Sequence, residues 1–258
     1  MNGLGSIGGT QMERNVTLLE QVISARPNFH ASETEVQRSF QPSESLLPVG
    51  DARKLASAGL TCYGVEKEVL RFIADCVGEG SKTLETGAGC STLVFAIQKA
   101  NHTTITPSQA EISRIQEYAE GIGIELRTVR FVPEASECYL PLCEEAELDL
   151  VFLDGKHAFP WPMVDWFYTA DRLKRGGLML LDDVQLRGVG VVAEFMRADP
   201  GWELIRDFWG KTFAFRKTRD TVLDVAWHMQ PWTVASMPSR PARILQKIRR
   251  RLSRLRGT

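Results

Sequence analysis

Residues 81–91 read SKTLETGAGCS and contain the turn on which the predicted fold depends. The run from Lys82 to Thr86 combines β-branched and apolar residues and predicts a short strand. Gly87 and Gly89 follow at once and allow the chain to bend sharply into a helix. Apolar residues at helical spacing also precede the strand, at positions 65, 69, 70, 73 and 77. A helix, a strand and a glycine turn in this order predict the start of an α/β sheet.

The following segments continue the alternation of helix and strand. We expect helices over 91–100, 108–120, 137–144, 162–173 and 189–198, and strands over 102–106, 125–131, 148–154 and 176–183. Strands joined through helices pair in parallel by right-handed crossovers, which predicts a doubly wound sheet. The strands GWELIRDF (201–208) and KTFAFRK (211–217) are separated only by Trp209 and Gly210, which suits a hairpin. The sequence therefore predicts a mostly parallel seven-stranded sheet that ends in an antiparallel hairpin.

The length of 258 residues, with 43% hydrophobic and 24% charged residues, fits one large domain with extensions. Residues 1–60 carry Pro27, Pro42 and Pro48 among Gly, Ser and Gln, and predict a flexible N-terminal extension with a short helix near 16–25. We expect the main domain over 61–220. Residues 221–258 form a C-terminal extension.

The C-terminal extension is strongly basic. From Arg240 onward there are eight Lys or Arg and no acid, which leaves 23 basic against 32 acidic residues in the rest of the chain, a net charge of −9. Ile244, Ile248, Leu252 and Leu255 fall on one helical stripe. Such a basic amphipathic helix predicts peripheral contact with an anionic membrane surface, with nucleic acid the less expected partner. Docking of the stripe on the body, or on a second subunit of a homo-oligomer, is the alternative.

Two features exclude other classes of protein. The five cysteines contain no CxxC pair, which argues against a zinc cage or a disulfide framework. No apolar run reaches the roughly 18 residues that a membrane span needs, and the first residues lack the pattern of a signal peptide. We therefore expect a cytoplasmic protein, at the inner membrane face if the basic helix binds lipid.

The glycine turn indicates a ligand site. In an open α/β sheet, ligands bind at the carboxyl ends of strands where the topology reverses, and helix N–H groups after the turn point toward them. A nicotinamide dinucleotide site would need a third glycine at position 92, which is Thr92, and would not need Glu85. A nicotinamide oxidoreductase is therefore the least favoured interpretation.

The segment from Glu85 to Gly89 resembles the E-x-G-x-G pattern of class I methyltransferases that depend on S-adenosylmethionine (SAM). Their Rossmann-like fold also has a parallel sheet closed by a hairpin. The resemblance implies that SAM is the cofactor, with Glu85 near its amino group and Gly87 and Gly89 beneath its methionine moiety. Ala88 and Ser91 belong to the same expected site.

The expected ribose and adenine contacts depart from the family pattern. The family places an acid at the end of the second strand, but residues 103–111, TTITPSQAE, offer Thr106 and Ser108 there, with Glu111 already one turn into the helix. We take Thr106 as the candidate contact. Residues 133–142 resemble the adenine-side loop of catechol-type O-methyltransferases, which makes Ser136 a candidate adenine contact and equally a helix N-cap.

Three acids follow two later strands. Asp154 ends the fourth strand, and Asp182 and Asp183 end the fifth, so their carboxylates are expected to converge. Gathered carboxylates repel one another unless a cation compensates, and Mg²⁺, or Mn²⁺ as its substitute, prefers oxygen ligands. Alternatively, one of Asp182 and Asp183 caps the following turn.

FLDGKHAF (152–159) and RGGLMLLDDV (175–184) resemble the metal-dependent O-methyltransferases of the catechol and macrocin types. This resemblance covers about 63–217 and implies that Asp154, Asp182 and Asp183 hold the metal beside the cofactor, with Asp154 also in contact with the cofactor. His157 stands where those families place a basic catalytic residue. A neutral imidazole there accepts the proton of a hydroxyl group during methyl transfer, with Asp154 as the second catalytic residue.

The sequence thus predicts an enzyme that methylates a hydroxyl of a small molecule or saccharide. Phe159 and Trp161, in a loop bounded by proline, are candidates for lining its acceptor pocket. Two alternatives remain open. One is a SAM-dependent methyltransferase that works without metal, and the other is a non-catalytic protein of this fold that binds membrane or RNA through its tail.

Overall fold

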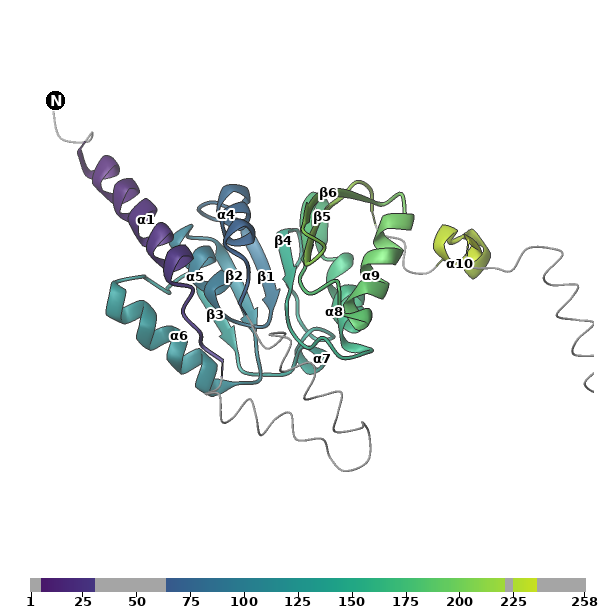
Figure 1. The fold of residues 1–258 in the computed structure, drawn as a ribbon, viewed down its shortest axis with the longest axis horizontal. Coiled ribbons are helices and arrows are strands. Elements are labelled where there is room, and N and C mark those ends of the chain that lie inside the picture. The colour runs from purple at the N-terminus through teal and green to yellow at the C-terminus, as the bar shows by residue number, and fades with distance from the viewer. Residues whose placement is uncertain (1–5, 31–63, 221–224, 236–258) are drawn as a thin grey trace, which may run out of the picture.

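A seven-stranded sheet lies at the centre of the protein (Figure 1). The computed structural model describes residues 6–30, 64–220 and 225–235. The strands lie in the order β3-β2-β1-β4-β5-β7-β6. Their bounds are β1 Lys82–Thr86, β2 Asn101–Ile105, β3 Val129–Val132, β4 Leu148–Leu153, β5 Leu173–Leu181, β6 Trp202–Phe208 and β7 Thr212–Lys217.

Strand pairing confirms the predicted topology. The strand β1 pairs in parallel with both β2 and β4, so the direction in which strands are added reverses beside it. The pair β4 and β5 is also parallel, whereas β7 runs antiparallel to β5 and β6. The three residues between β6 and β7 are too few for a crossover, which explains the hairpin. The sheet therefore has its topological switch point at the glycine turn after β1.

Helices cover both faces of the sheet. Side chains of β4 alternate, so that Leu150 and Phe152 pack into the core on one face, and Val151 and Leu153 into the core on the other. The first face is covered by α1 Ser6–Ala25, α4 Lys67–Cys76, α5 Cys90–Ile97 and α6 Gln109–Ile122. The second is covered by α7 Ser136–Tyr139, α8 Trp161–Ala170 and α9 Arg187–Ala198. Because both faces are covered, the ends of the strands are where a ligand can reach the sheet.

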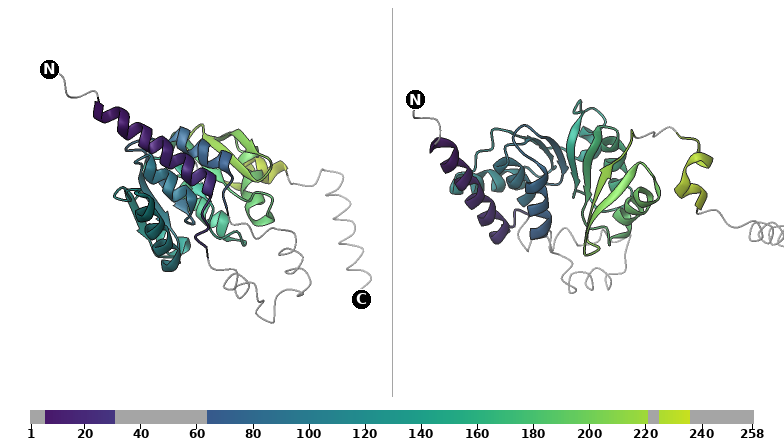
Figure 2. Two further views of the ribbon diagram at one scale, coloured as in Figure 1. Left: turned by 60° about the vertical axis from the view of Figure 1, so that its left-hand side comes forward. Right: turned by 90° about the horizontal axis from the view of Figure 1, so that it is seen from above.

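The N-terminal segment differs from the expected flexible extension. The helix α1 is 20 residues long and lies across α4 and α5 (Figure 2). Val22 and Ile23 are fully buried, and Arg26 forms an ion pair with Glu66 at 3.1 Å. Residues 6–30 are therefore part of the folded body, because burial of these apolar side chains stabilises the helix. Residues 31–63 lie outside the described part of the chain.

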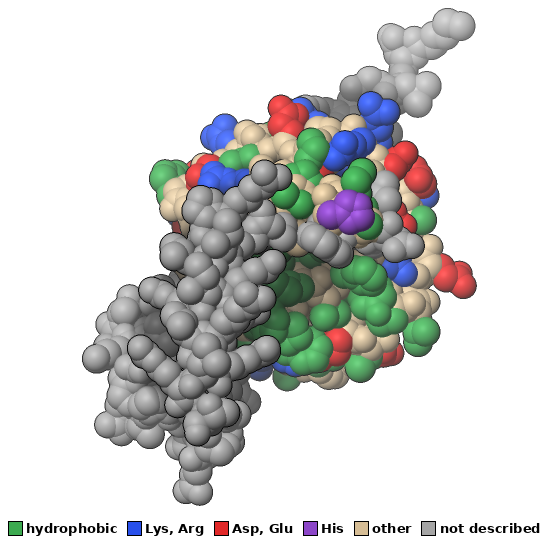
Figure 3. Space-filling view, turned by 90° about the vertical axis from the view of Figure 1, so that its right-hand side faces the viewer, with side chains coloured by type: hydrophobic (Ala, Val, Ile, Leu, Met, Phe, Trp, Pro, Cys, Tyr) green, Lys and Arg blue, Asp and Glu red, His purple; other side chains and the backbone are tan. Residues whose placement is uncertain are grey.

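The C-terminal extension is described only over residues 225–235, which contain the 3₁₀ helix η1 Trp227–Met229 and α10 Pro231–Ala235. Trp232 packs edge-on against Phe195 of α9, with ring centroids 6.0 Å apart. Apolar side chains gather on this face of the molecule, which Figure 3 shows, around a hollow of about 500 Å³. The predicted basic helix over 240–258 lies outside the described residues. Among the helices that the structure describes, none has the length and apolar character needed to span a bilayer.

Candidate active site

A cavity of about 300 Å³ opens at the carboxyl ends of β1, β2, β4 and β5. It is lined by His30, Thr86, Gly87, Ala88, Ile105, Thr106, Pro107, Ser108, Glu111, Ala135, Ser136, Glu137, Asp154, Gly155, Lys156, His157, Asp182, Asp183 and Lys211. These residues come from both sides of the switch point, as the rule for ligand sites in open sheets predicts. The glycine bend and the three predicted acids therefore share one cavity.

The glycine bend lies directly against the tip of β4. Gly87 has φ +89°, and a Cβ atom there would lie 2.4 Å from the carbonyl oxygen of Asp154. The backbone N–H of Asp154 donates to the Thr86 carbonyl at 3.0 Å, and that of Gly87 donates to the Ile105 carbonyl at 2.9 Å. Only glycine fits a bend of this sign and closeness. The bend therefore fixes the backbone of Asp154 beside the cavity.

Glu85 lies beneath the bend and does not line the cavity. Its side chain is buried and accepts hydrogen bonds from Ser91, at 2.6 Å, and from Thr92. His102 Nε2 lies 3.1 Å from Glu85 Oε1, and His102 Nδ1 lies 2.8 Å from Thr83 Oγ1. This network anchors the turn into α5 from below.

Gly89 and Ser91 also fall outside the cavity lining. Gly89 is the N-cap of α5, and its N–H donates to Thr92 Oγ1 at 3.1 Å. Of the residues predicted to bind the cofactor, the structure brings together Gly87, Ala88, Thr106, Ser136 and Asp154.

Glu111 is a cavity residue that the sequence pattern did not assign. Its Oε2 accepts a hydrogen bond from Thr106 Oγ1 at 2.9 Å, and its Oε1 lies 3.1 Å from His30 Nδ1. The signal was present in the sequence, since Ser108 caps α6 and Glu111 follows three residues later. The side chain reaches back past the cap, so the carboxylate lies near the end of β2 although its backbone belongs to the helix.

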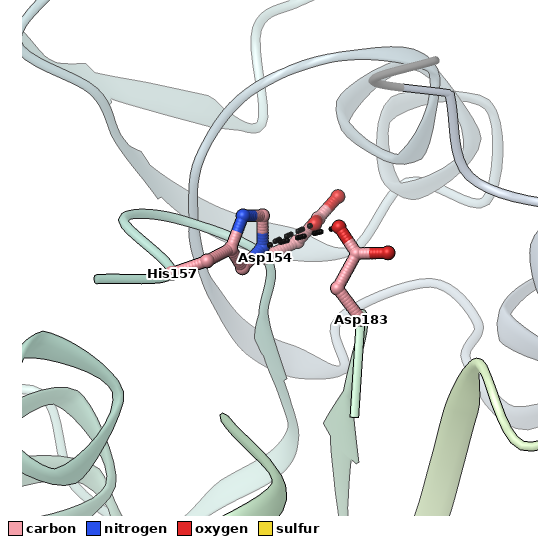
Figure 4. A group of neighbouring side chains, drawn as sticks. All are labelled: Asp154, His157 and Asp183. Atoms are coloured by element: carbon pink, nitrogen blue, oxygen red, sulfur yellow. Dashed lines mark ion pairs between the residues drawn. The ribbon is translucent and has the colours of Figure 1, made fainter. Parts of the chain in front are cut away.

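Asp154, His157 and Asp183 point toward one another at the other end of the cavity (Figure 4). His157 Nε2 lies 3.4 Å from Asp154 Oδ1 and 3.6 Å from Asp183 Oδ2. One ligand atom from each of these residues lies within 4.8 Å of the other two. The structure thus brings two of the three predicted metal ligands, Asp154 and Asp183, close to the predicted base, His157.

Asp182 is engaged differently. Lys211 Nζ donates to Asp182 Oδ2 at 2.6 Å, and Thr212 Oγ1 donates to Asp182 Oδ1. Lys211 Nζ also lies 3.4 Å from Asp183 Oδ1. Asp182 is buried and holds these partners through both oxygens, so its charge is compensated from within the chain. The sequence pattern did not point to Lys211, which belongs to the turn of the hairpin.

Burial and neighbouring charges shift the pKa values of the cluster. Desolvation and then the charge of Asp182 raise the pKa of Asp154 to about 7. Burial alone would lower the pKa of His157, but the close carboxylate of Asp154 and the charges of Asp183 and Asp182 outweigh it and raise that pKa. The cluster therefore attracts positive charge.

Local backbone geometry holds the cluster in place. Asp183 has φ +55°, a left-handed conformation that aspartate tolerates better than most residues. Its Oδ1 accepts a hydrogen bond from Gln185 at 2.8 Å. A Cβ atom at Gly188, in the first turn of α9, would lie 2.4 Å from the carbonyl oxygen of His157. The loop that carries His157 is therefore packed tightly against α9.

Phe159 and Trp161 do not line this cavity. Phe159 is 69% exposed, and Trp161 lies under Lys156, whose Nζ is 4.2 Å from the ring centroid. Lys156 itself lines the cavity. These aromatic residues thus flank the side of the cavity on which His157 lies.

Part of the chain matches a known protein family, and several solved structures share its fold. Residues 84–184, from β1 to the end of β5, match the family model of a methyltransferase domain. The cofactor-bound structure of Rv0187 from MTB is similar, with a TM-score of 0.54, 16% identity and coverage of 74% of this chain and 100% of that chain. A Corynebacterium glutamicum protein gives a TM-score of 0.53, 15% identity and coverage of 74% and 99%. The O-methyltransferase NovP gives a TM-score of 0.52 and 15% identity, with coverage of 60% of this chain and 81% of that chain.

No curated protein matches the sequence. The similar solved structures establish the fold, and the family match covers the segment that contains the glycine bend, Asp154, His157 and Asp183. Residues 84–184, which supply most of the cavity lining, thus resemble a methyltransferase domain, and the fold around them is shared with an O-methyltransferase of known structure.

Proposed function

We propose that this enzyme transfers the methyl group of SAM to a hydroxyl oxygen of a small molecule or saccharide, with assistance from a divalent cation. The observation that carries this proposal is the convergence of Asp154, His157 and Asp183 in the cavity that also contains the glycine bend. A methyl donor on the bend and an acceptor at the cluster would be neighbours. Such alignment of the two reactants can lower the barrier to an in-line transfer by about 7–11 kcal/mol.

The donor set fits a divalent cation. Asp154 and Asp183 offer carboxylate oxygens to a cation, and the buried Nε2 of His157, which has no hydrogen-bond partner of good geometry among the described residues, stays available as a base. Two carboxylates without full compensation favour a hard cation, Mg²⁺ or Mn²⁺. Asp182 fits less well as a ligand because Lys211 and Thr212 engage both of its oxygens. When bound, the cation would lower the pKa of an acceptor hydroxyl.

His157 acts as the general base in this proposal. Its imidazole takes the hydroxyl proton while the oxygen attacks the methyl carbon, and the carbon–sulfur bond breaks with its electrons on sulfur. The products are a methyl ether, S-adenosylhomocysteine (SAH) and a protonated His157. Asp154, at 3.4 Å, stabilises the imidazolium that forms. Binding of a cation through Nε2 would remove this base, so the proposal places the cation on the carboxylates.

The rest of the cavity suits the cofactor. Gly87 and Ala88 offer a close backbone approach to the methionine moiety. Thr106 and Glu111 lie at the start of α6 and Ser136 at the start of α7, where the nucleoside would bind. A carboxylate such as Glu111 accepts hydrogen bonds from both hydroxyls of a ribose. Glu111 therefore takes the place of the strand-end acid that the family pattern expects.

Methyl transfer from SAM to a panel of catechols, phenols and saccharides, with Mg²⁺, Mn²⁺ or EDTA, tests the proposal. We expect EDTA and Asp183→Asn each to lower turnover strongly, and His157→Gln to lower it by about 10²- to 10⁴-fold. Asp149→Asn is the matched control, because Asp149 lies at the opposite end of β4 and pairs with Lys174. Methylation of nitrogen or carbon acceptors alone would refute the proposal.

A second candidate is the same reaction without metal. It is favoured by Lys211, whose ammonium group lies 2.6 Å from Asp182 and 3.4 Å from Asp183. In this version Lys211 supplies the positive charge and His157 with Asp154 forms a catalytic pair. Turnover that is unchanged by EDTA but lost in Lys211→Met would select it.

A further inference from the structure

The segment that follows α1 is anchored along the cavity side of the body. This strap, residues 26–30, runs from the end of α1 beside α6 (Figure 1). Arg114 Nε of α6 donates to the Phe29 carbonyl at 2.7 Å, and the buried Phe29 ring packs edge-on against Tyr118 at 5.4 Å. Cys90 Sγ donates to the Pro27 carbonyl at 3.3 Å. The strap is therefore attached both to α6 and to the first turn of α5.

The last residue of the strap enters the cavity. His30 lines it, and its Nδ1 lies 3.1 Å from Glu111 Oε1. Because a carboxylate only accepts hydrogen bonds, Nδ1 carries the hydrogen in this contact. Thr106 holds the other oxygen of Glu111 at 2.9 Å. Glu111 is thus fixed from two sides, by the residue that follows β2 and by a segment that precedes the residues matched by the family model.

This arrangement is more than helix capping. In the usual capping box, a glutamate at the third helical position reaches back to the backbone N–H of the cap residue. Here Ser108 accepts from the Glu111 backbone N–H at 3.2 Å, but the Glu111 side chain turns to Thr106 and His30 instead. The side chains of Glu111 and His30 keep 17% and 26% of their exposure. Both remain accessible from the cavity.

We propose that the strap completes the nucleoside end of the cofactor site, with His30 orienting Glu111 so that its carboxylate receives the ribose hydroxyls of SAM. This inference rests on the proposed placement of SAM in the cavity. Each carboxylate oxygen has a second lone pair, so Glu111 keeps the capacity to accept from two hydroxyls while it holds its protein partners. His30 is a positioning residue in this assignment, and its contribution to cofactor affinity depends on the two ribose hydroxyls.

Isothermal titration of SAH and of its 2′,3′-dideoxy analogue, without metal or acceptor, tests the assignment. We expect wild-type protein to prefer SAH, and His30→Ala to weaken SAH binding by about tenfold, the factor expected for one hydrogen bond to a charged group. The same variant should leave affinity for the dideoxy analogue unchanged. His30→Asn retains a donor near the position of Nδ1 and should recover most of the SAH affinity.

Glu20→Ala is the matched control, because Glu20 pairs with Arg71 at 3.1 Å and ties α1 to α4 away from the cavity. It should bind both ligands as the wild type does. An equal loss of both ligands in His30→Ala would show a general packing effect and overturn the assignment. If wild-type protein bound no SAH, the cofactor placement and the strap assignment would fall together. If His30→Ala weakened binding of SAH but not of the dideoxy analogue, and the wild-type protein transferred no methyl group, the result would count against the proposed reaction alone.

Discussion

Lys211 and Asp182 form a contact of 2.6 Å between the turn of the C-terminal hairpin and the tip of β5. The Asp182 side chain is only 3% exposed and that of Lys211 is 24% exposed. Burial alone would lower the pKa of Lys211, but the charge and hydrogen bond of Asp182, with the charges of Asp183 and Asp154, raise it. The hairpin therefore supplies a permanent positive charge to a cavity that is otherwise acidic.

Lys211→Met is expected to destabilise the protein by about 2–4 kcal/mol, because it leaves the Asp182 carboxylate buried without its partner. The double variant Asp182→Asn with Lys211→Met should recover most of this loss, since neither charge then remains. Urea unfolding of the four proteins of this cycle measures the effect. If the losses of unfolding free energy in the two single variants simply added in the double variant, the result would contradict an ion pair between Lys211 and Asp182.

Gly87→Ala and Gly89→Ala should differ sharply. A Cβ at Gly87, with φ +89°, would overlap the Asp154 carbonyl, whereas one at Gly89 meets nothing within 4 Å. We expect a cost of about 2–4 kcal/mol for Gly87→Ala and below about 1 kcal/mol for Gly89→Ala. Denaturant unfolding compares them. Similar costs for both would show that the bend does not press on β4.

Gly188→Ala should lower activity more than stability. The new Cβ would lie 2.4 Å from the His157 carbonyl, so the loop must shift and carry the imidazole away from Asp154 and Asp183. A displacement near 1 Å costs about 10²-fold in rate. Gly121→Ala in α6 is the control, because its Cβ would meet nothing within 4 Å. Unchanged turnover in Gly188→Ala would show that the loop position is unimportant.

Asp165→Asn should stabilise the protein in a pH-dependent way. Burial raises the pKa of Asp165 from 3.8 to about 6, although the nearby Ser136 and Thr86 hydroxyls oppose this. A raised folded-state pKa means that the carboxyl group costs nothing while protonated in both states and becomes destabilising as pH rises from about 4 to about 6. The variant should therefore match the wild type near pH 4 and exceed it by up to about 3 kcal/mol above about pH 6.

Urea unfolding across this pH range checks the prediction, and Asp149→Asn gives the opposite sign. Burial alone would raise the pKa of Asp149, but the hydrogen bonds from Lys174 and the Lys82 N–H hold it below its usual value. Asp149 therefore stabilises the fold at neutral pH, and its variant should be the weaker protein there and converge with the wild type as pH falls. If the difference in unfolding free energy between Asp165→Asn and the wild type did not vary with pH, the raised pKa of Asp165 could not be its cause.

The sequence predicted the sheet well because its signals are local. Alternating strands and helices, the glycine turn and the short link between β6 and β7 all follow from short-range patterns, and the structure confirms the seven strands and the hairpin. The convergence of Asp154 and Asp183 also follows from their places at neighbouring strand ends. These features needed no knowledge of distant contacts.

The remaining site residues depend on contacts between distant parts of the chain. Glu111 belongs to a helix by its pattern, and only the direction of its side chain brings it beside Thr106. His30 lies in a proline-interrupted segment that predicted flexibility, yet it is tied in through α6. The sequence shows Lys211 only as a polar turn residue, and the pairing of β7 with β5 is what brings it to the acids. Periodicity and spacing carry no information on such contacts.

The position of Lys211 in the chain has a consequence for synthesis. Every other residue that lines the cavity precedes it, and the nearest of these in sequence, Asp183, lies before the whole of α9 and β6. A nascent chain that has emerged only through β5 thus presents the acids of β4 and β5 without their lysine counterion. Domains generally fold as units during synthesis. The acids of β4 and β5 therefore gain their lysine counterion only after the hairpin has emerged from the ribosome and β7 has paired with β5.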